Sequence, residues 1–186
     1  MLILVRHGRT AANAAGVLNG HGDLPLDEVG VLQAKAVANA VGRIDRMIAS
    51  PLQRAQQTAE AFGVPFETDE RWIEIDYGEF EGKAFAELPP GTWDRWRKDS
   101  SFTPPGGESL ETLDSRVRQA CEELLEEAAT NDVVVVSHVS PIKAAIGWAL
   151  GTGDEVSWHL FVQVASIARV AIGPWGPSLH SFNETA

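Results

Sequence analysis

Short apolar runs alternate along the chain with longer stretches in which apolar residues recur at helical spacing. The clearest run is Val133–Val136, four consecutive valines, and the chain opens on a second run, Leu2–Val5. Unbroken runs of this kind are typical of parallel strands that are covered on both faces. Arg46–Ala49 and Ala165–Ile172 predict two further strands. Because these runs alternate with helical patterns, the sequence indicates an α/β fold.

The helical patterns are equally distinct. Leu110–Ala128 carries a single apolar stripe with Glu and Arg on its other faces, and it predicts the longest helix. Asp27 is placed as the N-cap of a helix that continues to about residue 41. Ser50-Pro51 suggests a capping residue followed by proline at the first helical position. A shorter helix is expected from Pro141 to near Gly151, and the last dozen residues are interpreted as a tail.

Composition narrows the class of protein. The chain has 186 residues and a formal net charge of −11, which fits one domain over residues 1–186 and disfavours nucleic acid or an anionic membrane as a partner. The single cysteine, Cys121, lies in a helical apolar pattern, so we expect it to be buried in a reducing compartment. Arg6 interrupts the apolar opening too early for a signal peptide, and no stretch is long enough to span a membrane. A cytoplasmic location is the resulting expectation.

Two of the predicted strands end in histidine. Leu2–Val5 leads into Arg6-His7-Gly8, and the valine run leads into Ser137-His138. In an open parallel sheet, ligands bind beyond the carboxyl ends of the strands. If the two strands are neighbours, both imidazoles face the same site, with a guanidinium beside one of them. Arg54 would add a second guanidinium near the start of the helix that follows Ser50.

Two arginines and two histidines suit phosphoryl transfer, which depends on positioning and on charge stabilisation around the phosphoryl oxygens. The arginine fork matches phosphate geometry, so this set needs no metal or cofactor. A general acid for the leaving group is still required. Glu74 is the candidate because apolar neighbours favour its protonated form, but from spacing alone Asp76 or Glu79 is nearly as good.

These residues fall into ordered blocks that resemble the histidine phosphatase superfamily, the phosphoglycerate mutase-like group. The resemblance covers residues 2 to about 150. The blocks are Arg6-His7-Gly8-Arg9-Thr10 with Asn13, Ser50-Pro51-Leu52-Gln53-Arg54-Ala55, Glu74 with Tyr77-Gly78, Gly106-Gly107-Glu108-Ser109, and Ser137-His138.

The resemblance implies a three-layer α/β sandwich with a mixed, mostly parallel sheet and helices on both faces. It also implies that His7 attacks phosphorus and becomes phosphorylated, and that Glu74 protonates the leaving oxygen and then activates water. The phosphoryl oxygens would be held by Arg6, Arg54 and His138, with help from Asn13 and, on a looser match, from Asn19 and Gly20.

Mutases and phosphatases of this superfamily share that chemistry. The resemblance to mutases would imply basic residues after the general acid, whereas here Ile75-Asp76 follows Glu74. A phosphatase acting on a small-molecule phosphate ester is therefore preferred. The stretch from Ser137 to Lys143 is similar to the branch of the alpha-ribazole and broad-specificity acid phosphatases. Mutase-type transfer and a non-catalytic phosphate-binding protein remain the alternatives, together with a metal-dependent hydrolase.

An insertion at about residues 84–106 is expected to decide the substrate. It contains Phe85, Trp93 and Trp96, which can form a cover over the leaving group or can pack as ordinary core residues, and the sequence favours neither. His21 lies in a loop that can reach the pocket. The sequence also leaves open a homodimer through an exposed strand or an apolar helix.

Overall fold

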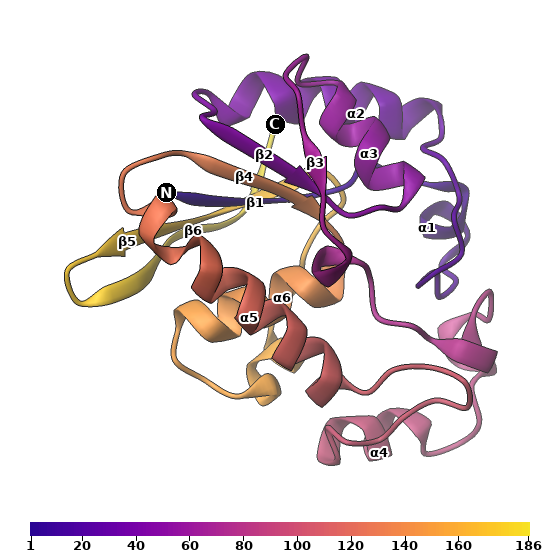
Figure 1. Cartoon of the computed structure of the whole chain (residues 1–186). Helices are drawn as coiled ribbons and strands as arrows, with labels where there is room; N and C mark the ends of the chain where they lie inside the picture. Colours follow the sequence, from indigo (N-terminus) through magenta and orange to yellow (C-terminus); the bar gives the residue numbers. More distant parts are fainter.

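The structure, a computed structural model, describes all 186 residues. One six-stranded sheet runs through the molecule in the order β3-β2-β4-β1-β5-β6 (Figure 1). The first four strands in this order pair in parallel, and β5 and β6 add an antiparallel hairpin at one edge. The strands are β1 (Leu2–Arg6), β2 (Arg46–Ala49), β3 (Glu67–Thr68), β4 (Val133–Ser137), β5 (Ser166–Gly173) and β6 (Gly176–Thr185).

Helices cover both faces of the sheet, which confirms the predicted three-layer sandwich. Figure 1 shows α2 and α3 over one face and α5 and α6 over the other, with α4 set away from the sheet. The helices are α1 (Ala11–Ala15), α2 (Glu28–Val41), α3 (Gln53–Glu60), α4 (Thr92–Lys98), α5 (Leu110–Ala128) and α6 (Val139–Ala149). Short 3-10 turns complete the chain, the longest being η4 (Asp154–His159).

The core consists of two apolar clusters separated by the sheet. Successive residues of a strand point to opposite faces, so Leu2 and Leu4 of β1 pack with α5 and α6, whereas Ile3 and Val5 pack with α2 and α3. The four valines of β4 divide between the clusters in the same way. This double burial explains why both strands appear in the sequence as unbroken apolar runs. Cys121 belongs to the α5 cluster and is buried, as expected.

The parallel pairing brings three strand ends to one edge of the sheet. Arg6 lies opposite Ser137 in the β1–β4 register, and the ladder continues one residue further, where the His7 amide donates to the Ser137 carbonyl at 3.0 Å. On the other side of β4, the Ser50 amide donates to the Val136 carbonyl at 2.9 Å. The residues that follow β1, β2 and β4 are therefore neighbours.

Three local predictions are wrong. Ser50 does not cap a helix: α3 begins at Gln53, with Leu52 at the N-cap and no side-chain cap. The helix expected from Pro141 begins two residues earlier, at Val139. The C-terminal residues form strand β6 rather than a tail, because their amides and carbonyls pair with β5 across a turn at Gly173 and Gly176. By contrast, Asp27 caps α2 as predicted, with its carboxylate accepting from the Gly30 amide at 2.8 Å.

The first prediction concerns the central strand. Leu4→Ala removes a fully buried side chain from the middle of β1 and is expected to lower the free energy of unfolding by about 2–5 kcal/mol. Urea denaturation measures this change. Leu32→Ala is the matched control, because that side chain is 66% exposed on α2 and its loss should change stability by less than about 0.5 kcal/mol. Equal effects of the two substitutions would contradict the assignment of the core.

Candidate active site

His7 follows β1 and is buried, with 3% of its surface exposed. Its Nδ1 lies 2.7 Å from the Gly8 carbonyl oxygen. Because a carbonyl oxygen only accepts, Nδ1 carries the proton and Nε2 keeps its lone pair free. Burial and then the charges of Arg54 and Arg6 hold the pKa of His7 well below its usual value. The structure thus provides a neutral imidazole with a free Nε2.

Gly8 is required because helix α2 packs against the backbone at this position. Its φ is not positive, but a Cβ at this position would lie 2.4 Å from the carbonyl oxygen of Gly30 in α2. Helix α2 therefore packs directly against the backbone beside His7, and only glycine leaves room for this contact.

His138 follows β4 and is completely buried beside His7, with 5.0 Å between the ring centroids. Its Nδ1 accepts from Arg54 Nε at 3.2 Å, so its proton is on Nε2, which donates to Ser50 Oγ at 2.7 Å. Burial, followed by the charge of Arg54, holds the pKa of His138 well below its usual value. Ser50, which the sequence suggested as a helix cap, instead orients this imidazole.

Arg54 is placed by the first turn of α3 and is 1% exposed. Besides His138, its guanidinium donates to backbone carbonyl oxygens of one loop, those of Gly22 at 2.8 Å, Gly20 at 2.7 Å and Asn19 at 3.3 Å, and to the side-chain oxygen of Asn19 at 3.2 Å. No carboxylate forms an ion pair with it, and burial lowers its pKa. A buried cation surrounded by neutral dipoles favours a nearby anion.

Arg6 is also a cation in the site that forms no ion pair. Its Nη1 donates to the Val162 carbonyl at 2.7 Å, whereas its buried Nε has no partner in the protein. Burial lowers the pKa of Arg6 to about 10, and no acidic side chain pairs with it. The site therefore contains two guanidinium groups that form no ion pair, next to two neutral imidazoles; the charge of Glu74 acts on both guanidinium groups without direct contact.

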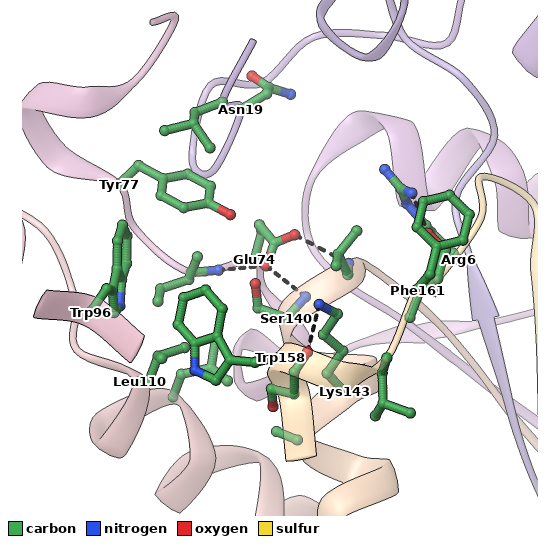
Figure 2. Close-up of a pocket in the computed structure, with 18 of the residues that line it drawn as sticks. Arg6, Asn19, Glu74, Tyr77, Trp96, Leu110, Ser140, Lys143, Trp158 and Phe161 are labelled. Carbon is green, nitrogen blue, oxygen red and sulfur yellow. Dashed lines mark hydrogen bonds between the residues drawn. The ribbon is translucent and has the colours of Figure 1, made fainter. Parts of the chain in front are cut away.

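Glu74 is buried, but its surroundings are polar rather than apolar as the sequence suggested. Its Oε1 accepts from the amides of Ile75 at 2.9 Å and Ser140 at 3.1 Å, and its Oε2 accepts from the Val139 amide at 3.1 Å (Figure 2). Two of these donors are the first amides of α6, where the helix dipole also favours negative charge. These contacts fix the direction of the carboxyl group in the site.

The Gly106-Gly107-Glu108-Ser109 block holds the segment that carries Glu74. A Cβ on Gly107 would lie 2.5 Å from the Asp76 carbonyl oxygen, so the two segments touch backbone to backbone. Glu108 pairs with Arg116 at 2.8 Å, and Arg116 donates to the Glu74 carbonyl at 3.3 Å. His21 reaches the same carbonyl through Nε2 at 3.0 Å. No sequence pattern pointed to Arg116, because its role depends on how α5 packs.

A cavity of about 560 Å³ opens beside these groups. Among the predicted site residues, Arg6, Asn13, Asn19 and Glu74 line it, whereas His7, Arg54, His138 and Gly20 do not. Figure 2 shows Tyr77, Trp96 and Trp158 on one side of the cavity and Arg6 with Phe161 on the other, with Glu74 and Lys143 between them. Of the three carboxylates that the sequence left open, Glu74 lines the cavity and Asp76 and Glu79 do not.

The three residues expected to assist at the phosphate, Asn13, Asn19 and Gly20, differ in what they contact. Asn13 completes the capping box of α1, where its Oδ1 accepts from the Thr10 amide at 3.0 Å, and its side-chain amide nitrogen has no protein partner. Asn19 and Gly20 face Arg54 through their carbonyl oxygens, and the Gly20 amide is bound by Glu81 at 3.0 Å. The Asn19–Gly20 segment therefore orients Arg54 in this structure.

The aromatic residues of the insertion were expected either to cover the leaving group or to pack in the core, and they differ in burial. Trp96 is 2% exposed and belongs to the α5–α6 core, where it contacts Tyr77 and Phe102 edge to face. Trp93 is half-buried and stacks on Trp96, with 5.7 Å between the ring centroids. Phe85 is exposed at the rim. All three of Phe85, Trp93 and Trp96 line the cavity, so the insertion forms one of its walls.

No group of three or more His, Cys, Asp or Glu side chains is placed to hold a metal ion. None of the helices combines the length and the hydropathy that crossing a bilayer requires. The polar groups that gather at the strand ends are instead guanidinium, imidazole and a single carboxyl, the set that recognises and transfers a phosphoryl group.

The fold and this site define an α/β protein with buried guanidinium and imidazole groups at the carboxyl ends of its strands. The sequence model of the histidine phosphatase superfamily (branch 1) matches residues 2–185, and the chain belongs to that superfamily.

Curated relatives include a bifunctional protein of Mycobacterium tuberculosis, which is 37% identical over 177 residues; the match covers 90% of this chain and 49% of that protein. The chain thus spans about half the length of the first curated relatives it matches. A protein of Yersinia pestis described as a probable phosphoglycerate mutase is 34% identical over 199 residues, with 98% of this chain and 92% of that protein covered.

Solved structures of similar proteins carry phosphatase names. A phosphoserine phosphatase variant of Entamoeba histolytica, in complex with phosphoserine, superposes with a TM-score of 0.91 at 28% identity and covers 98% of this chain and 96% of its own. An Escherichia coli protein described as a candidate alpha-ribazole-5′-phosphate phosphatase gives 0.88 at 27% identity, with 100% and 96% covered. The second match agrees with the branch that the sequence resembled.

The second prediction uses the two buried imidazoles. Their pKa values lie well below 6.5 in the folded protein, so below about pH 6.5 the unfolded state binds more protons. The free energy of unfolding should therefore fall with decreasing pH, by up to about 1.4 kcal/mol per pH unit for each imidazole. Urea denaturation at pH 7 and pH 5 measures the loss.

His138→Gln is expected to make that loss smaller, because it removes one of the two groups that must stay uncharged. His159→Gln, at an exposed position on η4, is the matched control and should keep the wild-type difference between the two pH values. If His138→Gln loses as much stability as the wild type, the imidazole is not held neutral by the fold.

Proposed function

We propose that this protein is a metal-independent phosphatase that hydrolyses small-molecule phosphate monoesters through a phosphohistidine on His7. The observation that carries this proposal is the free Nε2 of a neutral imidazole beside two buried guanidinium groups that form no ion pair. A phosphate dianion supplies the missing negative charge and places phosphorus next to the nucleophile.

In the first step, Nε2 of His7 attacks phosphorus, a P–N bond forms and the ester P–O bond breaks. Arg6 and Arg54 stabilise the charge on the equatorial oxygens. The phosphoryl oxygens compete with loop carbonyls for the donors of Arg54, and the unpaired Nε of Arg6 and the free amide nitrogen of Asn13 are further donors. His138, whose two nitrogens are both occupied, holds Arg54 in place and can contact the anion only after giving up one of these partners.

Glu74 is assigned as the proton donor and acceptor. In the first step its protonated carboxyl group gives a proton to the leaving alkoxide, and in the second its carboxylate takes a proton from the water that attacks phosphorus and breaks the P–N bond. The amides of Ile75, Val139 and Ser140 stabilise the carboxylate that forms between the steps. The proton count closes, since the enzyme regains its starting state when phosphate leaves.

Hydrolysis is preferred to mutase transfer because the cavity is wide and largely apolar beyond the phosphoryl-binding groups. A mutase must retain a phosphorylated acid through two half-reactions, and this requires several cations at the far end of the site. Apart from Arg6, the only cationic side chain that lines this cavity is Lys143. Phosphoserine, the ligand of the Entamoeba phosphatase structure, is a phosphate monoester of the proposed kind. The lack of a gathered carboxylate–histidine set supports chemistry without a metal.

The third prediction tests the nucleophile. His7→Ala should abolish hydrolysis of p-nitrophenyl phosphate and remove an acid-labile, base-stable phosphoenzyme that rapid quenching detects in the wild type. His159→Ala is the matched control and should keep both signals. Wild-type activity should also survive prolonged dialysis against a chelator. Turnover by His7→Ala at the wild-type rate would falsify the assignment, and loss of activity on dialysis that a divalent metal restores would overturn metal independence.

The fourth prediction tests the general acid. Glu74→Gln should lower kcat/KM for an alkyl phosphate by about 10²–10⁴, because the alkoxide then leaves without a proton. The loss should be smaller for p-nitrophenyl phosphate, whose leaving group departs as a stable anion. Glu79→Gln, at an exposed position on the same segment, is the control and should keep wild-type activity on both substrates. An equal loss on the two substrates would mean that Glu74 has a structural role only.

A further inference from the structure

The part of the cavity beyond the phosphoryl-binding groups has an apolar, aromatic lining. Trp93 and Trp158 lie edge to face with 6.5 Å between their centroids, and both belong to segments outside the sheet, α4 and η4. Phe161, just after η4, also lines the cavity although 71% of its surface is exposed. An aromatic side chain left this open at the mouth of a pocket is available to pack against a ligand.

One cation lies among these aromatic residues. Lys143 is on α6, one turn after Val139, and its side chain enters the cavity near Glu74 (Figure 2). Its ammonium donates to the Ser157 carbonyl at 2.8 Å and has no ion pair. Burial is the main reason that its pKa is lowered. Three acidic residues line the cavity, and none of them forms an ion pair with Lys143: Glu74 is held by three amides, Asp114 is paired with Arg118 at 2.5 Å, and Asp154 lies at the start of η4.

We propose that the leaving group of the substrate combines an aromatic body with a carboxylate. The aromatic body lies between Phe161 on one side of the cavity and Trp93 and Trp158 on the other, and the carboxylate pairs with the ammonium of Lys143. An ammonium retains two further donors after its bond to Ser157, and a partly desolvated cation gains more from an anion than an exposed one does. This substrate class rests on the phosphatase function proposed above.

The alternative role of Lys143 is structural, since its bond to Ser157 ties η4 to α6. A structural role predicts equal effects of a substitution on all substrates. Recognition of a carboxylate instead predicts an effect that depends on the substrate, because the lost attraction counts only where the anion is present.

Four alkyl phosphates separate the two parts of the leaving group. Ethyl phosphate has neither part, 2-phenylethyl phosphate has the ring, 2-phospholactate has the carboxylate, and 2-phospho-3-phenyllactate has both. The kcat/KM of each is measured with the wild-type protein. The substrate with both groups should be hydrolysed most efficiently, at least about a hundredfold better than ethyl phosphate.

Two variants then test the assignments. Lys143→Gln should lower kcat/KM at least about tenfold more for the two carboxylate substrates than for their uncharged counterparts. Phe161→Ala should lower it about fivefold to tenfold more for the two phenyl substrates than for those without a ring. The matched controls are Lys35→Gln on the exposed face of α2 and Trp175→Ala at the 99% exposed tip of the β5–β6 hairpin. Both controls should leave all four substrate ratios unchanged.

The outcomes distinguish this inference from the function on which it rests. If none of the four esters and no p-nitrophenyl phosphate is hydrolysed, the phosphatase function itself is wrong. If the esters are hydrolysed but Lys143→Gln lowers all four alike, Lys143 does not recognise the carboxylate. If Phe161→Ala leaves the ratio of phenyl to non-phenyl substrates unchanged, the aromatic wall does not bind the leaving group.

Discussion

Two buried guanidinium groups that form no ion pair are the constraint on which the rest of the site depends. Removing a cation from water is costly, and a protein normally offsets that cost with a carboxylate. Here Arg54 is surrounded by backbone carbonyls and an imidazole, and Arg6 keeps an unpartnered Nε. The chain as a whole has a net charge of −11, so these buried cations contrast with the charge of the protein as a whole. Such an arrangement is stabilised when an anion enters.

Burial, aided by the same two cations, accounts for the state of the imidazoles. It keeps His7 neutral, and the Gly8 carbonyl decides which nitrogen is free. The fold supplies the geometry: β1, β2 and β4 run in parallel and end at one edge, which brings together residues that are far apart in the sequence. Helix α6 begins at that edge, and its first amides orient Glu74. The imidazoles, the cations and the carboxyl group are thus positioned by the backbone of the sheet and its neighbouring helices.

The sequence predicted the parts of the fold whose pattern is set by burial on both faces. Leu2–Val5 and Val133–Val136 were recognisable because every residue in them is covered. Strand β6 was missed because it is an edge strand in which bulges in the pairing with β5 and a positive φ at Asn183 break the alternation of apolar and polar residues. The start of α3 was misplaced because Ser50 carries a local capping signal, yet its hydroxyl is used by a histidine from another strand.

The site, like the fold, has some features that the sequence predicted and others that it did not. The order of the blocks along the chain predicted His7, Arg54, Glu74 and His138 as site residues, whereas only the three-dimensional packing shows that Glu74, unlike Asp76 and Glu79, lines the cavity. Nothing local distinguishes Lys143 or Phe161 from surface residues, because their position depends on where η4 packs against α6. Substrate specificity therefore lay outside what the sequence could show.

The most direct test of the central claim is the binding of orthovanadate, which mimics the phosphoryl group in transfer. Unfolding is followed in urea with and without the anion for the wild type and for Arg54→Gln. At a free concentration one hundred times the dissociation constant, the wild type should gain about 2.7 kcal/mol in the free energy of unfolding. Arg54→Gln should gain little at the same concentration. No gain in the wild type, or an equal gain in both proteins, would contradict the claim that the buried cations are there to hold an anion.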